Sequence, residues 1–287
     1  MQQGMKQNEW VVKTVDSILH THEEIERHLS YDESSGIYVA TYLGFIMKSA
    51  FQPIIHLDGS LMGYEALLRV YDEQTFVRCD TEQFVKSPFL SCNARLNIDT
   101  LARVLHLKNF FLHIAEGHLF LNTNPDAVID SVSVDYFNQF IHCRIQPMGT
   151  AIDQIYLELL EYKCSSDQAL TTSIQDLSKN GFKIALDDYG CKASSEIRAR
   201  NVRPDIIKMD RSLLAQYMVG VQEPLLKAIR VARELNAEVL LEGVEDFNFY
   251  LKARDLDVNY LQGYFIGRPE LVHYLSRPFE FFDKGWG

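Results

Sequence analysis

Carboxylate, amide and amine side chains recur at the ends of short apolar runs in this sequence. Brought together, such groups can bind divalent cations, move protons or hold phosphate oxygens. They are Glu65 and Arg69 in "GYEALLR", Asn122 in "LFLN", Glu158 and Glu161 in "LELLE", Asp187 and Asp188 in "ALDD", Lys208 and Asp210 in "IIKMD", Glu242 and Glu245 in "LLEGVE", and Gln262 in "LQGY". They form one site only if the elements that carry them converge.

Each of these residues also has an ordinary structural interpretation. Asp187 and Asp188 can form a turn or cap the next helix. Lys208 and Asp210 can form a surface ion pair worth less than about 1 kcal/mol. Glu242 can stabilise the start of a helix through the helix dipole. Taken singly, the residues do not distinguish a functional site from these interpretations.

The elements that carry these residues alternate regularly from residue 51 onward. Apolar runs predict strands at 51–57, 61–69, 119–122, 155–161, 182–188, 205–210, 237–244 and 260–266. Helical spacing predicts helices at 96–116, 127–141, 167–181, 194–201, 223–235 and 247–256. This alternation indicates a parallel sheet, and its length favours a (β/α)8 barrel. An open doubly wound sheet is the alternative, but the sequence lacks its GxGxxG turn.

A barrel would bring all the strand ends to one mouth. The carboxylates expected there are Glu65, Glu158, Asp187, Asp188 and Glu242. Two carboxylates about 4 Å apart repel by roughly 4 kcal/mol at an effective dielectric near 20, so Lys208 alone cannot neutralise them. Oxygen ligands, including the Asn122 amide, favour Mg²⁺ or Mn²⁺ over Zn²⁺.

An aspartate pair suits a two-metal site that aligns water with a phosphodiester, and Arg69 could grip a phosphate oxygen. A glycosidase carboxylate pair is the alternative chemistry. It does not account for Asn122, Lys208 or the surplus acids.

Composition narrows the class of protein. The 287 residues carry a formal net charge of -11, which opposes nonspecific binding to DNA or to an anionic membrane. Five scattered cysteines without a CxxC pair favour a reducing compartment. We expect a soluble cytoplasmic protein with no DNA partner and no direct membrane insertion. Apolar spacing over residues 8–30 predicts a short N-terminal helical extension.

The motifs as a set resemble the EAL-domain family, bacterial phosphodiesterases that cleave cyclic di-GMP to linear pGpG. The resemblance covers residues 48–275 and rests on "FQPI", "GYEALLR", "LFLN", "LELLE", "ALDDYG", "IIKMD", "EGVE" and "QGYFIGRP". It implies a modified (β/α)8 barrel with one early antiparallel strand. It also implies two regions, an N-terminal helical extension and linker at 1–47 and the phosphodiesterase barrel at 48–287.

The resemblance further implies a role for each matching position. Two Mg²⁺ or Mn²⁺ ions would be held by Glu65, Asn122, Glu158, Asp187, Asp188 and Glu242. The catalytic set would be Glu65, Asp188, Lys208 and Glu242, and the nucleotide contacts would be Gln52, Arg69 and Gln262. Supporting positions would be Glu161, which braces the loop after "DDYG", Asp210 and Glu245. Ca²⁺ is expected to bind but inhibit, because it is larger and less exacting in geometry.

One segment departs from the family pattern. After "DDYG", relatives carry a loop resembling "TGYSS", whereas this chain reads "CKASSEIRARNVRPD". In relatives that loop helps to order the second metal and forms part of a dimer contact. The departure motivates a rival hypothesis, a catalytically silent EAL protein that binds cyclic di-GMP or a protein partner. We also expect a homodimer through the barrel, a protein partner at residues 1–47, and no cyclase activity, since no GGDEF motif is present.

Overall fold

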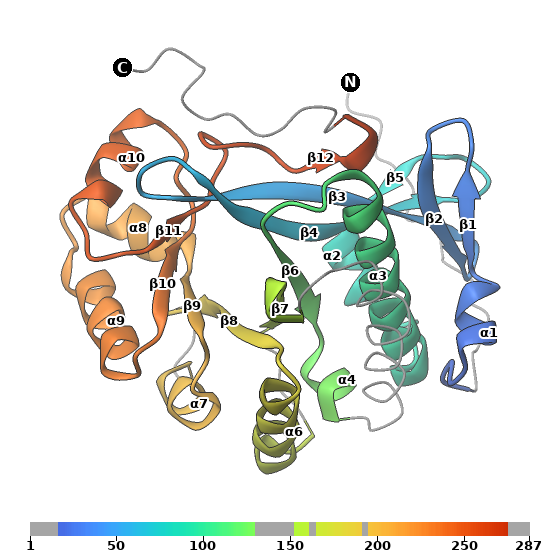
Figure 1. Ribbon diagram of the computed structural model, residues 1–287, viewed down its shortest axis with the longest axis horizontal. Coiled ribbons are helices and arrows are strands. Elements are labelled where there is room, and N and C mark those ends of the chain that lie inside the picture. Colours follow the sequence, from blue (N-terminus) through green and yellow to red (C-terminus); the bar gives the residue numbers. More distant parts are fainter. Residues whose placement is uncertain (1–16, 130–151, 161–164, 191–194, 275–287) are drawn as a thin grey trace, which may run out of the picture.

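Eight strands close into a barrel in the computed structural model of this chain, which describes residues 17–129, 152–160, 165–190 and 195–274 (Figure 1). The strands are β3 (Phe45–His56), β4 (Leu61–Asp72), β6 (His118–Thr123), β7 (Ile155–Leu159), β8 (Lys183–Tyr189), β9 (Ile206–Met209), β10 (Glu238–Leu241) and β11 (Tyr260–Leu261). They pair in the order β3, β11, β10, β9, β8, β7, β6, β4, and pairing of β4 with β3 closes the ring. The barrel prediction is confirmed.

The strand β3 is antiparallel to both of its barrel neighbours, β4 and β11, while the other barrel pairs are parallel. β3 and β4 form a long hairpin whose turn is closed by Asp58, which accepts a hydrogen bond from the Ser60 amide at 2.9 Å. Gly59 has a φ of 86° there, a left-handed conformation that glycine adopts without strain. The early antiparallel strand implied by the family resemblance is therefore present.

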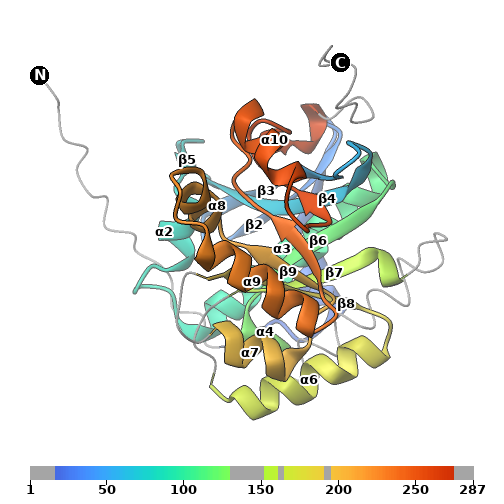
Figure 2. The ribbon, with the colours of Figure 1, turned by 90° about the vertical axis from the view of Figure 1, so that its left-hand side faces the viewer.

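Helices cover the outside of the barrel, and Figure 2 shows α6, α7 and α9 from the side. They are α2 (Thr81–Val85), α3 (Cys92–His113), α4 (Pro125–Ile129), α6 (Asp167–Lys179), α7 (Ser195–Val202), α8 (Arg211–Met218), α9 (Glu223–Glu234) and α10 (Phe247–Arg254). Ser91 caps α3 and Ser166 caps α6, each accepting a hydrogen bond from the backbone three residues on. α9 buries Leu225, Ala228 and Ala232, which lie on one helical face.

A compact apolar layer fills the inside of the barrel, with one residue from each strand. Its members are Ile54, Met62, Phe120, Tyr156, Ala185, Ile206, Leu240 and Tyr260. Phe120 and Tyr156 stack with ring centroids 4.4 Å apart. A larger apolar cluster lies between the strands and the surrounding helices. The inner layer closes the barrel as a packed core, so polar chemistry is confined to its mouth.

The described part of the N-terminal region begins at residue 17 and contains one short helix followed by two strands, and residues 8–16 of the helical prediction over 8–30 lie outside the described residues. Its one described helix is α1 (His22–Glu26), followed by β1 (Leu29–Asp32) and β2 (Ile37–Tyr42). β1 pairs with β2, and β2 pairs with β3, both antiparallel. A capping box formed by Thr21 and Glu24 begins α1. β2 is a partly buried strand that packs against α3. The boundary predicted at residue 48 falls inside β3.

Other element boundaries also differ from the predictions. The polar residues expected at the ends of strands 237–244 and 260–266 lie just beyond β10 and β11, in loops. The helix predicted at 127–141 is described only to Ile129, within α4, and the rest of it lies outside the described residues. α8 was not predicted, although Asp210 caps it. Short remaining elements are β5 (Arg78–Cys79), β12 (Glu270–Leu271), η3 (Ile152–Gln154) and η4 (Val272–Tyr274).

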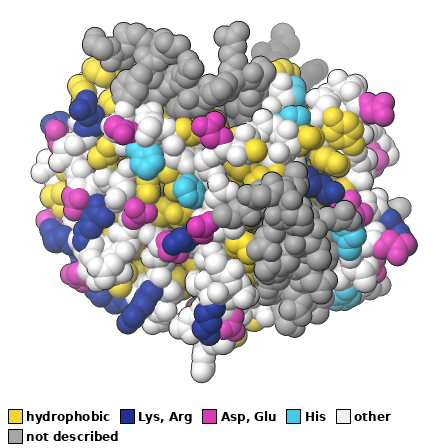
Figure 3. All heavy atoms as spheres, in the orientation of Figure 1, with side chains coloured by type: hydrophobic (Ala, Val, Ile, Leu, Met, Phe, Trp, Pro, Cys, Tyr) yellow, Lys and Arg dark blue, Asp and Glu magenta, His cyan; other side chains and the backbone are white. Residues whose placement is uncertain are grey.

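Acidic and basic side chains are interspersed on the face drawn in Figure 3. Among the coloured side chains of that face, Lys and Arg do not gather into one basic field of the kind that binds nucleic acid. None of the helices in the described ranges combines the length and apolar composition that crossing a bilayer requires.

Candidate metal centre

A layer of polar side chains lies one pleat beyond the apolar layer inside the barrel. Six of its members follow an apolar-layer residue by two positions, namely Asn122, Glu158, Asp187, Lys208, Glu242 and Gln262. Residues two apart in a strand point to the same face. The residue two positions after an apolar-layer residue therefore also points inward, but lies nearer the mouth of the barrel. On antiparallel β3 the order reverses, and Gln52 precedes Ile54. Gln52 pairs with Glu65 of β4, which completes the layer.

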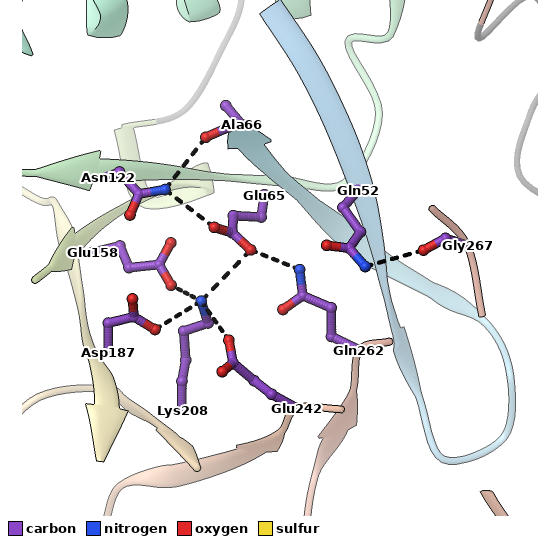
Figure 4. Close-up of polar contacts among 10 residues, drawn as sticks. All are labelled: Gln52, Glu65, Ala66, Asn122, Glu158, Asp187, Lys208, Glu242, Gln262 and Gly267. Carbon is purple, nitrogen blue, oxygen red and sulfur yellow. Dashed lines mark hydrogen bonds and ion pairs between the residues drawn. The ribbon is translucent and has the colours of Figure 1, made fainter. Parts of the chain in front are cut away.

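Lys208 lies at the centre of this layer with its side chain 1% exposed (Figure 4). Its Nζ is 2.8 Å from Glu242 Oε1, 3.0 Å from Asp187 Oδ1 and 3.6 Å from Glu65 Oε2. It also forms an ion pair with Glu158 Oε1, whose side chain is fully buried. Burial alone would lower the pKa of Lys208, but the Glu242 and Glu65 carboxylates outweigh it and raise that pKa. The ammonium therefore stays charged among four acids.

Glu65 is held in place by two amide side chains. Asn122 Nδ2 donates to Glu65 Oε1 at 3.1 Å, and Gln262 Nε2 donates to Glu65 Oε2 at 2.7 Å. Gln52 Nε2 donates to the Gly267 carbonyl at 3.0 Å, which joins β3 to the segment after β11. These bonds orient the Glu65 carboxylate and connect strands that lie far apart in the sequence (Figure 4).

Asp187 and Asp188 lie at an irregularity in β8. The pairing register of β8 with β9 shifts between Leu186 and Tyr189, and Asp188 has a φ of 52°. Aspartate tolerates this left-handed conformation better than most residues. Burial, followed by the Glu242, Glu65 and Asp188 carboxylates, raises the pKa of Asp187 well above its ordinary value. The bulge therefore lets two consecutive acids face the same crowded mouth.

The donor set fits hard divalent cations. Glu65, Glu158 and Glu242 each offer an oxygen, and these oxygens lie within 4.8 Å of one another; Asp187, Asp188 and Glu242 form a second such group. Among the described residues, Glu158 Oε2 is buried without a hydrogen bond or an ion pair, whereas Glu158 Oε1 and Asp187 Oδ1 have only the Lys208 ammonium as a partner. Buried carboxylate oxygens in that condition are unstable unless a cation balances them. Oxygen-only groups of this kind are what Mg²⁺, Mn²⁺ and Ca²⁺ prefer.

The other predicted residues take no part in the hydrogen bonds and ion pairs described above, or lie outside the described residues. Arg69 Nη1 donates to the adjacent Leu68 carbonyl at 2.9 Å, and burial lowers the pKa of the Arg69 guanidinium. Asp210 caps α8 and donates its backbone amide to the Tyr189 carbonyl at 3.1 Å, so it braces the end of β8. Glu245 is exposed after β10. Glu161 lies outside the described residues.

A buried ion pair that was not predicted from the sequence contacts the backbone just after Asn122. In α3, Arg103 Nη2 lies 2.9 Å from Asp99 Oδ2, and Asp99 Oδ1 accepts the Asn124 amide at 2.9 Å. The pair therefore fixes the segment that follows Asn122. Its signal is an acid and a base four residues apart within the apolar pattern of "NIDTLARVLHL".

Comparisons with known proteins bear on the family and the fold of this chain. A model of the EAL domain matches residues 46–269. A curated relative from Vibrio cholerae, cyclic di-GMP phosphodiesterase CdgJ, is 25% identical over 224 residues, which is 77% of this chain and 44% of CdgJ. The chain thus spans less than half the length of this curated relative.

Two solved structures show the same fold at low identity. The Bacillus subtilis YkuI protein, with an EAL domain and in complex with substrate c-di-GMP and calcium, has a TM-score of 0.68 at 21% identity, covering 82% of this chain and 57% of YkuI. The Klebsiella pneumoniae BlrP1 manganese and cy-diGMP complex has a TM-score of 0.65 at 20% identity, covering 79% and 56%. At these identities the likeness concerns the barrel itself.

Proposed function

The chain belongs to the EAL domain family, and from that premise we propose that it is a metal-dependent phosphodiesterase that hydrolyses cyclic di-GMP to linear pGpG. The observation that carries the proposal is the buried polar layer at the barrel mouth, with its two groups of three carboxylates. Curated relatives named cyclic di-GMP phosphodiesterases support the choice of substrate. The activity would lower a bacterial second messenger in the cytoplasm.

Two Mg²⁺ or Mn²⁺ ions are the proposed cofactors. The residues that would hold them are Glu65, Asn122, Glu158, Asp187, Asp188 and Glu242. When bound, such cations lower the pKa of a water molecule and stabilise charge on the attacking and leaving oxygens of a phosphodiester. The calcium and manganese complexes of YkuI and BlrP1 support a divalent site.

The protein's own residues would orient the reactants. Gln262 and Asn122 hold the Glu65 carboxylate from both sides, which fixes its direction before substrate arrives. Lys208 supplies a buried positive charge that can hold a water or a phosphate oxygen. Gln52 borders the mouth and Arg69 lies further along β4, where each would contact the nucleotide.

Supporting roles are proposed for three acids outside the cluster. Asp210 ties the start of α8 to the Tyr189 carbonyl and so steadies the bulge that carries Asp188. Glu245 would support the loop after β10, and Glu161 would brace the loop after Gly190. Homodimer formation through the barrel and a protein partner at residues 1–47 stay predictions.

A turnover assay tests the proposed function. Purified protein is incubated with cyclic di-GMP and Mg²⁺, Mn²⁺ or Ca²⁺, and nucleotides are separated by chromatography. We expect pGpG with Mg²⁺ or Mn²⁺ and little with Ca²⁺. Glu65→Gln should lose at least about a hundredfold in rate, the loss typical when a key group of a charge-stabilising site is removed.

The matched control is Glu73→Gln, which makes the same chemical change at an exposed turn position after β4. Its rate should equal that of the unaltered protein. If the unaltered protein binds cyclic di-GMP by calorimetry but forms no pGpG with any of the three metals, the silent-effector hypothesis replaces this one.

A further inference from the structure

The ammonium of Lys208 lies among the oxygens of one candidate cation group. That group consists of Glu65, Glu158 and Glu242, and Lys208 Nζ has an ion-pair contact with an oxygen of each of the three. A fourth contact, at 3.0 Å, reaches Asp187 of the other group. The single buried ammonium of Lys208 thus offsets negative charge in both groups of carboxylates.

A divalent cation and this ammonium cannot occupy the same position among these carboxylates. Mg²⁺ binds oxygen at about 2.0–2.1 Å and Ca²⁺ at about 2.3–2.6 Å, so a cation held by the three glutamates would need the space that Nζ fills. A doubly charged cation and the ammonium at so short a separation would also repel each other strongly. One of them must therefore leave the oxygens when the other binds.

Burial explains why the ammonium stays there when no cation competes. Removing one partner from a buried ion pair leaves an uncompensated charge, which is strongly destabilising. Glu158 is fully buried and Lys208 is 1% exposed, so neither can turn to solvent for hydration. The lysine is an internal substitute for a cation.

We infer that Lys208 is a built-in competitor of the divalent cation, and that cation binding expels its ammonium from the carboxylates toward the reacting groups. The inference rests on the proposed metal site and deepens it. Lys208 would stabilise the metal-free protein, weaken cation binding, and reach the water or phosphate only once the cation is in place. Loading of the site and release of the lysine would then be one event.

Calcium binding to the full chain, measured by isothermal titration calorimetry without nucleotide, tests this inference independently of turnover. Lys208→Met keeps the length of the side chain and removes its charge. We expect its dissociation constant for Ca²⁺ to fall at least tenfold. In EDTA its unfolding temperature should drop below that of the unaltered protein, and Ca²⁺ should raise it by more degrees.

Two further variants separate competition from other effects. Lys208→Gln can still donate to the carboxylates, so it should fold even if Lys208→Met does not, and it should also bind Ca²⁺ more tightly. Lys183→Met removes an ion-paired lysine at the start of β8. Its calcium affinity should change less than twofold.

The outcomes distinguish this inference from the proposed function. If the unaltered protein binds Ca²⁺ and neither Lys208 variant binds it more tightly, competition by Lys208 is refuted while the metal site stands. If no protein in the series binds Ca²⁺, the metal site and this inference fail together. If a Lys208 variant binds Ca²⁺ tightly and the unaltered protein does not, competition by Lys208 is supported, and it would explain an unaltered protein without turnover.

Discussion

Repulsion among the acids at the barrel mouth should lower the free energy of unfolding of the metal-free protein. The substitution Asp188→Asn removes one of these charges and should therefore raise that free energy. The oxygens of Asp187, Asp188 and Glu242 lie within 4.8 Å of one another. Asparagine has the shape of aspartate and also tolerates the φ of 52° at this position. The change therefore removes one negative charge and leaves the backbone conformation accessible.

The magnitude follows from Coulomb's law and its screening. At 4.8 Å and an effective dielectric near 20, each like-charged pair repels by roughly 3.5 kcal/mol. The raised pKa of Asp187 relieves part of this repulsion, and the partial exposure of Asp188 screens more of it. We expect a net gain of about 1–2 kcal/mol in the free energy of unfolding, or roughly 2–6 °C in Tm.

Thermal unfolding in EDTA and in saturating Ca²⁺ provides the assay. In EDTA, Asp188→Asn should unfold at the higher temperature. In Ca²⁺ the order should reverse, because a ligand at a hundred times its Kd stabilises the folded state by about 2.7 kcal/mol and the variant has lost a carboxylate ligand.

Asp255→Asn is the control, since Asp255 is an exposed residue at the end of α10. It changes the net charge equally and should leave both temperatures unchanged. If Asp188→Asn unfolds in EDTA at or below the temperature of the unaltered protein while Asp255→Asn is unchanged, acid crowding does not destabilise this fold.

The remaining predictions concern the buried polar groups under the N-terminal strands. Burial lowers the pKa of His106 to about 3, and its Nδ1 lies 2.8 Å from Ser49 Oγ. A folded-state pKa below the ordinary value of 6.5 gives stability above pH 6.5 that is lost toward acid, at about 1.4 kcal/mol per pH unit. Urea unfolding of the unaltered protein and of His106→Asn should therefore give a difference in free energy of unfolding that shrinks by about 2 kcal/mol between pH 7 and pH 5. A difference that does not change with pH would contradict a neutral buried imidazole. The control is His113→Asn, at the exposed end of α3. Asn109 bonds both the amide and the carbonyl of Tyr38, at 2.8 and 2.9 Å. Asn109→Ala should cost about 2–3 kcal/mol and speed amide exchange in β2; unaltered exchange there would show that α3 does not hold this strand.

Local patterns were enough to predict most of the parallel barrel. Apolar runs separated by amphipathic segments identify the strands from β6 to β11, because strand and helix periods depend on residues a few positions apart. The same runs end in the polar residues that the structure gathers, so the composition of the site was readable as well. The antiparallel course of β3 came from the family resemblance, and its local signal is the turn "DGS" between the runs 51–57 and 61–69, which is too short to join parallel strands.

The N-terminal strands show where local patterns were insufficient. Within the predicted helical range of 8–30, His22–Glu26 forms α1, but β1 begins at Leu29 and β2 follows it, and neither strand was predicted. β2 is held by the Asn109 side chain, which lies 71 positions away from Tyr38 in the sequence. A short segment with weak preferences follows whichever partner buries it, and that partner is not visible in the segment itself.

The sequence by itself determined which side chains are available at the mouth, since an acid, an amide or a lysine follows six of the eight interior apolar residues by two positions. Tertiary structure alone decided which of them meet. Gln262 reaches Glu65 across 197 positions, Lys208 lies among four carboxylates, and Arg69 donates instead to the adjacent Leu68 carbonyl. The physical reason is that a side chain's type is encoded locally, whereas its neighbours depend on barrel closure and strand register, which arise from hydrogen bonds between distant segments.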